Sequence, residues 1–210
     1  MTAGADELRG AVERIAPAAA VERLLMFLSF LRAENDRMNL VSAKSAEPAE
    51  LVARHLRDAL DGLPLLPEPV AGRRLRLLDI GSGGGFPAIP LLVCRGDVEG
   101  LLYESTGKKA GYLERCLREL GLTGGVVNAR FPAALPMNHP FDVLTSRAVA
   151  EGGKLVRKAR RYMSADARAL LWTTDDLVET VEKESGMHRW SFRKSQGAEH
   201  RGIAVLERFT

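Results

Sequence analysis

A run of glycines between two acidic residues is the part of the sequence best suited to hold a ligand. The run from Gly81 to Gly85 follows Asp79 closely, and Glu104 comes 25 residues after Asp79. Glycines at 81, 83 and 85 allow the backbone to turn tightly and to approach a ligand without an intervening Cβ. The pattern therefore predicts a ligand cradle flanked by two carboxylates, Asp79 and Glu104; a glycine-rich turn without function is the alternative.

Phe86 distinguishes between the ligands that such a loop can hold. Gly81 and Gly83 match the first two glycines of the dinucleotide fingerprint, but Phe86 occupies its third position. A phenylalanine there obstructs close packing of helix on strand and the approach of a pyrophosphate. No Gly-Lys pair follows at the spacing of a P-loop, which excludes that motif. A ligand without phosphate is therefore favoured.

S-adenosylmethionine is a ligand of this kind, with an amino-acid end, a ribose and an adenine. Asp79 can engage its ammonium group, directly or through water, and Glu104 can accept hydrogen bonds from both ribose hydroxyls. An acid at the place of Glu104 also binds ribose in dinucleotide folds. The choice of S-adenosylmethionine over a dinucleotide therefore rests on Phe86. For Asp79 and Glu104, the alternative interpretation is that they are solvated residues at strand ends.

Alternating strand and helix patterns predict where this loop lies. Apolar runs at 75–80 and 98–103 predict strands, and helical spacing predicts helices at 86–94 and 108–120. Such alternation indicates a parallel sheet covered on both faces, and ligands bind beyond the carboxyl ends of its strands. Further strands are expected at 126–128, 141–145, 169–173, 188–192 and 203–209, and further helices at 152–162 and 175–184.

The two ends of the chain depart from this alternation. The last two strands have no helix between them, which predicts an antiparallel hairpin on one edge of the sheet. Apolar stripes from Val21 to Leu31 and from Leu51 to Ala59 predict helices before a Pro- and Gly-rich segment at 64–72. We expect a helical N-terminal extension over residues 1–63 and a Rossmann-like α/β domain over residues 73–210.

The composition is that of a globular protein. Hydrophobic residues make up 46% and charged residues 27%, which excludes a disordered chain or a disulfide scaffold. The formal net charge of +3 permits a nucleic-acid partner without requiring one. Cys94 and Cys116 lack zinc or redox spacing and are expected as buried thiols. Without a membrane span or a signal-peptide pattern, we expect a cytoplasmic protein with no membrane partner and no metal.

Several motifs together resemble one known family. Residues 79–91, Asp-Ile-Gly-Ser-Gly-Gly-Gly-Phe-Pro-Ala-Ile-Pro-Leu, are similar to the cofactor motif of the RsmG (GidB) family, bacterial 16S ribosomal RNA guanine-N7 methyltransferases. Further matches lie at 38–42, 54–58, 104–109 and 146–150, in the order and spacing of that family. The segments Gly-Phe-Pro-x-Ile-Pro and Ser-Arg-Ala are more specific than the glycines alone.

The resemblance implies a class I S-adenosylmethionine methyltransferase fold, with a seven-stranded sheet that has a reversed edge strand. It implies S-adenosylmethionine as the cofactor and places Arg147 at the mouth of the site, facing the guanine. Guanine N7 carries a lone pair and no proton, so the site must align the reactants and needs no general base. The expected cofactor-binding residues are Asp79, Gly81, Gly83, Gly85, Phe86, Glu104, Ser105, Arg130, Phe131 and Arg147.

The same resemblance implies ribosomal RNA or the small ribosomal subunit as the partner of a protein that we expect to be a monomer. Expected RNA contacts are His55, Lys108, Lys109 and the basic residues Lys154, Arg157 and Lys158 of one predicted helix. The alternatives are a packing role for His55, a salt bridge for Arg147 and a solvated face for the basic helix. Asn39, Arg54 and Asp58 are expected to support the N-terminal helices over the cofactor pocket, with RNA contact as the alternative.

Two segments differ from the family pattern. Arg130-Phe131-Pro132-Ala133 lacks a glutamate that usually lies near the adenine, and Trp172-Thr173-Thr174 stands where Lys-Gly is usual. These differences leave two alternatives open. One is a methyltransferase of the same fold that acts on another RNA or a small molecule, and the other is a non-catalytic RNA-binding or assembly factor.

Overall fold

A mixed β-sheet forms the centre of the computed structural model, which describes residues 3–42, 47–135, 140–147, 151–187, 189–196 and 198–207. Within these residues the sheet has seven strands in the order β3-β2-β1-β4-β5-β7-β6. β1 to β5 are parallel, and β7 runs antiparallel to both β5 and β6. The strands are β1 (Leu75–Ile80), β2 (Val98–Tyr103), β3 (Gly124–Val127), β4 (Phe141–Arg147), β5 (Met163–Thr174), β6 (Trp190–Lys194) and β7 (Arg201–Glu207).

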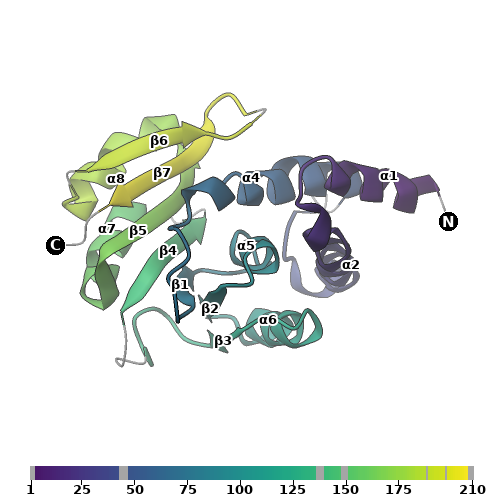
Figure 1. Ribbon diagram of the computed structural model, residues 1–210, viewed down its shortest axis with the longest axis horizontal. Coiled ribbons are helices and arrows are strands. Elements are labelled where there is room, and N and C mark those ends of the chain that lie inside the picture. The colour runs from purple at the N-terminus through teal and green to yellow at the C-terminus, as the bar shows by residue number, and fades with distance from the viewer. Residues whose placement is uncertain are drawn as a thin grey trace.

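Helices cover both faces of the sheet (Figure 1). One face packs on α1 (Ala3–Glu13), α2 (Val21–Met38), α5 (Ala88–Cys94), α6 (Gly107–Glu119) and a helical segment formed by α3 (Pro48–Glu50), the π-helical turn η3 (Leu51–Leu56) and α4 (Arg57–Leu60). The other face packs on α7 (Gly152–Ala159) and α8 (Val178–Ser185). Short 3₁₀ turns lie at η1 (Ala18–Ala20), η4 (Leu63–Leu65), η5 (Arg160–Tyr162) and η6 (Asp175–Leu177).

Alternation along the strands divides the core into these two layers. Leu77 and Val143 point to the layer of the N-terminal helices, whereas Leu78 and Leu144 point to the layer of α7 and α8. In Figure 1, α1 and α2 lie at one end of the long axis, and α7, α8 and the β6–β7 hairpin lie at the other. Among the described residues, no helix combines the length and the apolar character needed to cross a membrane.

The element boundaries confirm most of the sequence predictions. β1 and β2 match the predicted strands residue for residue, α6 begins one residue earlier than predicted, and α5 begins at Ala88 rather than at 86. β5 begins at Met163, six residues before the predicted strand, because exposed residues at 165 and 166 leave its first half without a continuous apolar run. The predicted terminal hairpin is present, with β7 lying between β5 and the edge strand β6.

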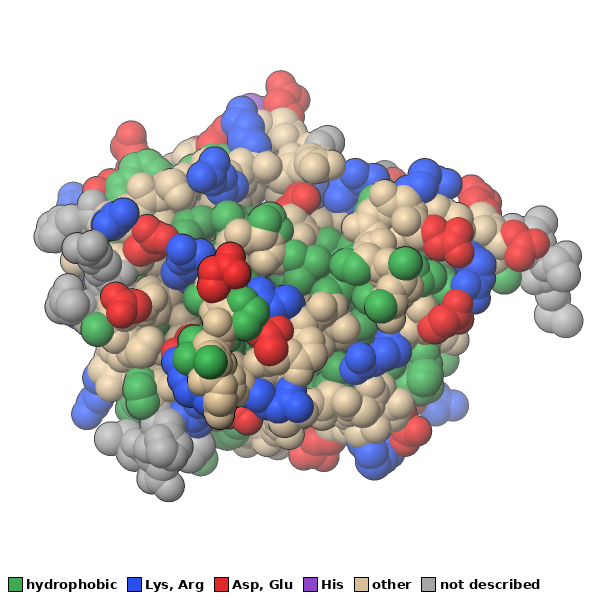
Figure 2. All heavy atoms as spheres, in the orientation of Figure 1, with side chains coloured by type: hydrophobic (Ala, Val, Ile, Leu, Met, Phe, Trp, Pro, Cys, Tyr) green, Lys and Arg blue, Asp and Glu red, His purple; other side chains and the backbone are tan. Residues whose placement is uncertain are grey.

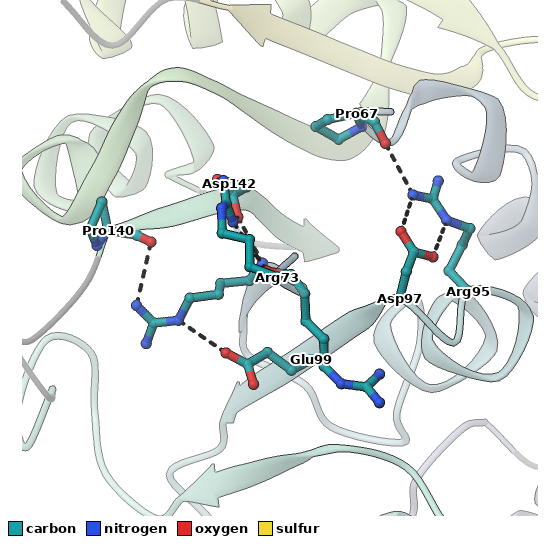
Figure 3. A network of polar contacts seen from close by, with 9 residues as sticks. Pro67, Arg73, Arg95, Asp97, Glu99, Pro140 and Asp142 are labelled. Atoms are coloured by element: carbon teal, nitrogen blue, oxygen red, sulfur yellow. Dashed lines mark hydrogen bonds and ion pairs between the residues drawn. The ribbon is translucent and has the colours of Figure 1, made fainter. Parts of the chain in front are cut away.

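Ion pairs hold together the amino ends of the central strands (Figure 3). Asp142, at the start of β4, accepts hydrogen bonds from Arg73 Nη1 at 2.6 Å, from Arg73 Nη2 at 2.9 Å and from the Arg76 backbone N–H at 2.9 Å. Nearby, Arg95 binds Asp97 through two bonds of 2.7 Å. This network lies at the amino ends of the parallel strands, opposite their carboxyl ends, and stabilises the sheet.

Replacing Asp142 with alanine is expected to lower the free energy of unfolding at pH 7 by about 1–3 kcal/mol. Burial alone raises the pKa of Asp142, but hydrogen bonds from Arg73 and Arg76 outweigh burial and lower it. The stabilisation is therefore complete above the pKa of an unfolded aspartate, about 4, and is lost as pH falls through the lower folded pKa. Urea unfolding at pH 7 and below pH 4 measures this, and an unchanged difference between the two proteins at low pH would contradict it.

Candidate active site

The glycine loop folds back over the carboxyl end of β2. The Gly81 N–H donates to the carbonyl of Tyr103 at 2.9 Å, and the Gly83 N–H donates to Glu104 Oε2 at 3.0 Å. Glu104 Oε1 accepts a bond from the Thr106 N–H at 2.7 Å. Each carboxylate oxygen has a second acceptor position. Glu104 therefore supports the loop and can still accept hydrogen bonds from a ligand.

Gly83 and Gly85 adopt backbone conformations that favour glycine, with φ of 51° and 91°. A Cβ on Gly85 would lie 2.8 Å from Ile89 Cγ1 and 3.2 Å from the ring of Phe27. A Cβ on Gly83 would meet no neighbour closer than the Gly81 carbonyl oxygen at 3.8 Å. Gly85 is thus required for packing of the loop, whereas Gly83 leaves the space beside the loop open.

Asp79 is fully buried at the end of β1. Its Oδ1 accepts a hydrogen bond of 2.6 Å from Thr145 Oγ1, while its Oδ2 is buried without a partner in the described residues. Burial raises the pKa of Asp79 to about 6, against the opposing effects of Ser82, Thr145 and Arg147. Because buried polar atoms are nearly always hydrogen-bonded, Oδ2 is an acceptor suited to a cationic or N–H group.

Phe86 is buried between three side chains from different elements. Its ring meets Phe27 edge-on at 5.1 Å and stacks on His55 at 5.4 Å between centroids. The guanidinium of Arg147, at the end of β4, lies 5.2 Å from the centroid of the Phe86 ring. The ring that the sequence analysis singled out thus joins the glycine loop to the N-terminal helices and to β4.

His55 lies on the π-helical turn η3, an irregularity that is frequent at functional sites. Both of its ring nitrogens are buried without a hydrogen-bond partner in the described residues. Burial, reinforced by the positive charge of Arg147, lowers the pKa of His55 to about 4. The imidazole is therefore neutral at pH 7 and offers one N–H donor and one acceptor.

A cavity of about 370 Å³ lies beside Phe86, lined by residues that include His55, Asp58, Arg147, Trp172 and Arg201. The sequence analysis did not single out Arg201 for this site. The missed signal is strand direction: because β7 is antiparallel, its first residue, Arg201, pairs with Thr174 at the carboxyl end of β5. Trp172 likewise reaches the site from β5 and donates from Nε1 to the Asp58 carbonyl at 2.7 Å.

The remaining residues predicted to bind cofactor lie around the ends of β2 and β3. Ser105 and Arg130 are exposed. Phe131 is half-buried, with its ring edge-on to Tyr103 at 5.4 Å and to Tyr162 at 5.9 Å.

The residues predicted to bind RNA lie in three places. His55 faces the cavity, and Lys108 and Lys109 lie in the first turn of α6, where Lys109 Nζ donates to the Asn39 carbonyl at 3.3 Å. Lys154, Arg157 and Lys158 lie on α7, on the opposite face of the sheet from His55. Lys154 pairs with Glu151 at 2.6 Å and with Glu184 at 3.9 Å, whereas Arg157 and Lys158 are exposed.

A second cavity, of about 440 Å³, lies between the N-terminal helices and the β6–β7 hairpin. Its lining includes four cations and one acid: Arg14, Arg57, Arg193, Lys194 and Asp61. Arg57 is the neighbour of Asp58 in the chain, so the two cavities flank the same helical segment. These cations come from three separate segments of the chain, so no single basic run in the sequence indicated the cavity.

Comparison with known proteins identifies the family. A family model described as rRNA small subunit methyltransferase G matches residues 20–197. The chain belongs to the rRNA small subunit methyltransferase G family. The family resemblance inferred from the motifs is thereby confirmed, and the match extends beyond the last of those motifs, at 146–150.

Named members of the rRNA small subunit methyltransferase G family are similar over most of this chain. The protein of that name from Sorangium cellulosum is 41% identical over 197 residues, covering 91% of this chain and 81% of the relative. The one from Chromobacterium violaceum is 38% identical over 149 residues, covering 70% of this chain and 68% of the relative.

Solved methyltransferase structures share the fold. A precorrin-6y C5,15-methyltransferase from Geobacter metallireducens superimposes with a TM-score of 0.57 at 14% identity, covering 83% of this chain and 96% of that one. A ribosomal protein L11 methylase from Lactobacillus delbrueckii gives 0.55 at 15% identity, covering 71% and 76%. These likenesses confirm the predicted Rossmann-like methyltransferase fold with its reversed strand and helical N-terminal region.

Proposed function

We propose that this protein transfers a methyl group from S-adenosylmethionine to N7 of a guanine in 16S ribosomal RNA. Membership of the rRNA small subunit methyltransferase G family supports the reaction and its substrate. The observation that carries the proposal is the cluster that Asp79, Gly83 and Glu104 form at adjoining strand ends, next to Phe86 and Arg147.

The residues of this cluster fit the cofactor. The unpartnered Oδ2 of Asp79 suits the ammonium group, and the free acceptor positions of Glu104 suit the two ribose hydroxyls. The open side of Gly83 allows close approach to the loop. Ser105, Arg130 and Phe131 would complete the adenine end. When bound, S-adenosylmethionine supplies a methyl group on a positively charged sulfonium.

The chain contributes alignment rather than proton transfer. Guanine N7 carries no proton, so its methylation needs no general base. His55 is buried and neutral, and we assign it no proton transfer in the reaction. Arg147, held over Phe86, can stack on the base or contact O6 or a phosphate; a bond to N7 itself would block the nucleophile. Burial lowers the pKa of Arg147, and the nearby carboxylates of Asp58 and Asp79 oppose this effect, so the charge of Arg147 is partly balanced before RNA binds.

Replacing Asp79 with asparagine is expected to stabilise the free protein at pH 7 by on the order of 1–3 kcal/mol. The buried carboxylate has a raised pKa, so its ionisation above about pH 6 disfavours the folded state, and stability increases as pH falls toward 4. Asparagine removes that penalty and also removes the charge proposed to bind the ammonium. Urea unfolding at pH 5 and pH 7 should show a smaller pH dependence in the variant.

The matched variant is Thr145→Val, which removes the hydrogen bond from Thr145 Oγ1 to the Asp79 carboxylate and should destabilise the protein at pH 7. Calorimetry with S-adenosylhomocysteine should show weaker binding by Asp79→Asn, by about 10-fold or more. A less stable Asp79→Asn protein that keeps full affinity would disprove the assignment of Asp79.

The basic cavity is the proposed contact for the RNA backbone near the site. Its four cations surround one hollow, whereas Lys, Arg, Asp and Glu side chains are interspersed over most of the face drawn in Figure 2. A triple variant with alanine at Arg57, Arg193 and Lys194 should bind RNA more weakly. The slope of log K against the logarithm of the salt concentration should become shallower by about 2–3. Filter binding of 16S RNA at several salt concentrations measures this slope; an unchanged slope would exclude the cavity as a phosphate contact.

Methyl transfer to small ribosomal subunits tests the proposed function. Subunits from a strain that lacks this gene are incubated with the protein and labelled S-adenosylmethionine, and the RNA is digested and analysed by mass spectrometry. The expected product is 7-methylguanosine at one position of 16S RNA. Transfer to free small molecules with none to RNA would instead support a methyltransferase with another substrate. Intact cofactor binding with no transfer would support an RNA-binding factor.

A further inference from the structure

The cavity beside Phe86 has the size of a small-ligand pocket. Its volume of about 370 Å³ is in the usual range of about 300–1,000 Å³. Asp58 and Trp172 are 7% and 5% exposed and form its buried part, whereas the side chain of Arg201 is 45% exposed and lies toward solvent. His55 and Arg147 contact Phe86 and form the side next to the glycine loop.

The carboxylate of Asp58 is buried with few partners. The Trp172 indole donates to the backbone carbonyl of Asp58 and not to its carboxylate. Oδ2 pairs with Arg201 Nη1 at a long distance of 3.5 Å. An ionised carboxylate can accept about four hydrogen bonds. The buried His55 ring nitrogens have no partner in the described residues, and Asp58 has acceptor positions beyond its contact with Arg201, so the cavity offers polar groups suited to a polar ligand.

We propose that the Asp58 carboxylate recognises the Watson–Crick edge of the target guanine, accepting hydrogen bonds from N1–H and from the N2 amino group. This inference rests on the proposed function and extends it to the choice of base. Guanine is the RNA base that presents two adjacent donors on this edge, which matches the two oxygens of one carboxylate. Adenine presents an acceptor at N1 and is therefore disfavoured.

The order of the residues matches the order of atoms around the base. Asp58 contacts Trp172 and Arg201, whereas His55, three residues earlier in the same helical segment, stacks on Phe86. A guanine whose Watson–Crick edge meets Asp58 turns its opposite side, with N7, toward Phe86 and the glycine loop. O6 lies between the two edges, where the neutral His55 ring can donate its N–H.

Substituting inosine for guanosine tests this contact, because inosine lacks only the N2 amino group. Small subunits are reconstituted with 16S RNA that carries guanosine or inosine at the mapped target position. Wild-type protein and Asp58→Asn are compared on both by kcat/KM for methyl transfer, and S-adenosylhomocysteine affinity is measured by calorimetry. Asp142→Asn is the control, since it changes a carboxylate that is 6% exposed at the far end of the sheet.

The wild type should methylate inosine about 10-fold or more slowly than guanosine, since one charge-assisted hydrogen bond is lost. Asp58→Asn should methylate guanosine about 100-fold more slowly than the wild type, because its amide places a donor against the base. It should also discriminate between the two bases by less than about threefold, with cofactor affinity unchanged. Asp142→Asn should discriminate as the wild type does.

Equal discrimination by the wild type and Asp58→Asn would overturn the inference, as would a guanosine rate for Asp58→Asn that matches the wild type. Wild-type protein that binds S-adenosylhomocysteine but methylates neither subunit would instead refute the proposed function, and this inference with it. The two failures are therefore distinguishable.

Discussion

Replacing Arg147 with alanine is expected to lower kcat/KM for methyl transfer to small subunits by about 10²–10³-fold. The guanidinium lies 5.2 Å from the centroid of the Phe86 ring and lines the cavity proposed for the guanine. Its removal takes away a positioned cation at the place where base, methyl group and sulfur must align. Single-turnover transfer with labelled cofactor measures the chemical step, and calorimetry with S-adenosylhomocysteine separates it from cofactor binding.

Two further variants sharpen this result. Arg147→Lys keeps the charge but loses the planar group that stacks on a base, so it should restore only a small part of the rate. Arg168→Ala removes a half-buried arginine of β5 that pairs with Glu207 at 3.0 Å, and should change the rate by no more than about twofold. Transfer by Arg147→Ala at the wild-type rate would exclude Arg147 from the chemistry.

Glu104→Ala is expected to bind S-adenosylhomocysteine about 100-fold more weakly than the wild type. The substitution removes the proposed ribose acceptor and also leaves the N–H groups of Gly83 and Thr106 without their partner. Glu104→Gln should be intermediate, because the amide oxygen can replace one acceptor while the amide NH₂ faces an N–H donor. Isothermal titration calorimetry gives the affinities directly.

Glu99→Ala is the matched control for Glu104. Glu99 lies on the same strand, β2, is 39% exposed in its side chain, and pairs with Arg76 at 3.2 Å at the opposite end of the sheet. Its loss should leave affinity within about twofold of the wild type. If Glu104→Ala also bound as well as the wild type, the ribose would have to lie elsewhere.

Local patterns predicted most elements of the fold because its central strands are apolar and are separated by turn residues. β1 and β2 carry such runs and were predicted residue for residue. The start of β5 was missed because the exposed Ala165 and Asp166 interrupt the apolar pattern between the buried Met163 and Ala167. The terminal hairpin was predicted, but the position of β7 between β5 and β6 depends on pairing between strands, which periodicity does not encode.

The sequence located the glycine loop and its carboxylates because they are close together in the chain or follow adjacent strands. The structure places Glu104 against Gly83, as strand ends in a parallel sheet require. Arg201 was missed because only an antiparallel strand brings its first residue to this edge. Helical spacing grouped Lys154, Arg157 and Lys158, but it does not tell which face of the sheet their helix covers.

A structure of the protein with bound S-adenosylhomocysteine tests the central claim most directly. We predict its ammonium group within hydrogen-bonding distance of Asp79 Oδ2, both ribose hydroxyls at the Glu104 carboxylate, and its sulfur on the side of the glycine loop where Phe86 and Arg147 meet. A product molecule bound away from Asp79 and Glu104, or a dinucleotide bound at the glycine loop in its place, would contradict this assignment.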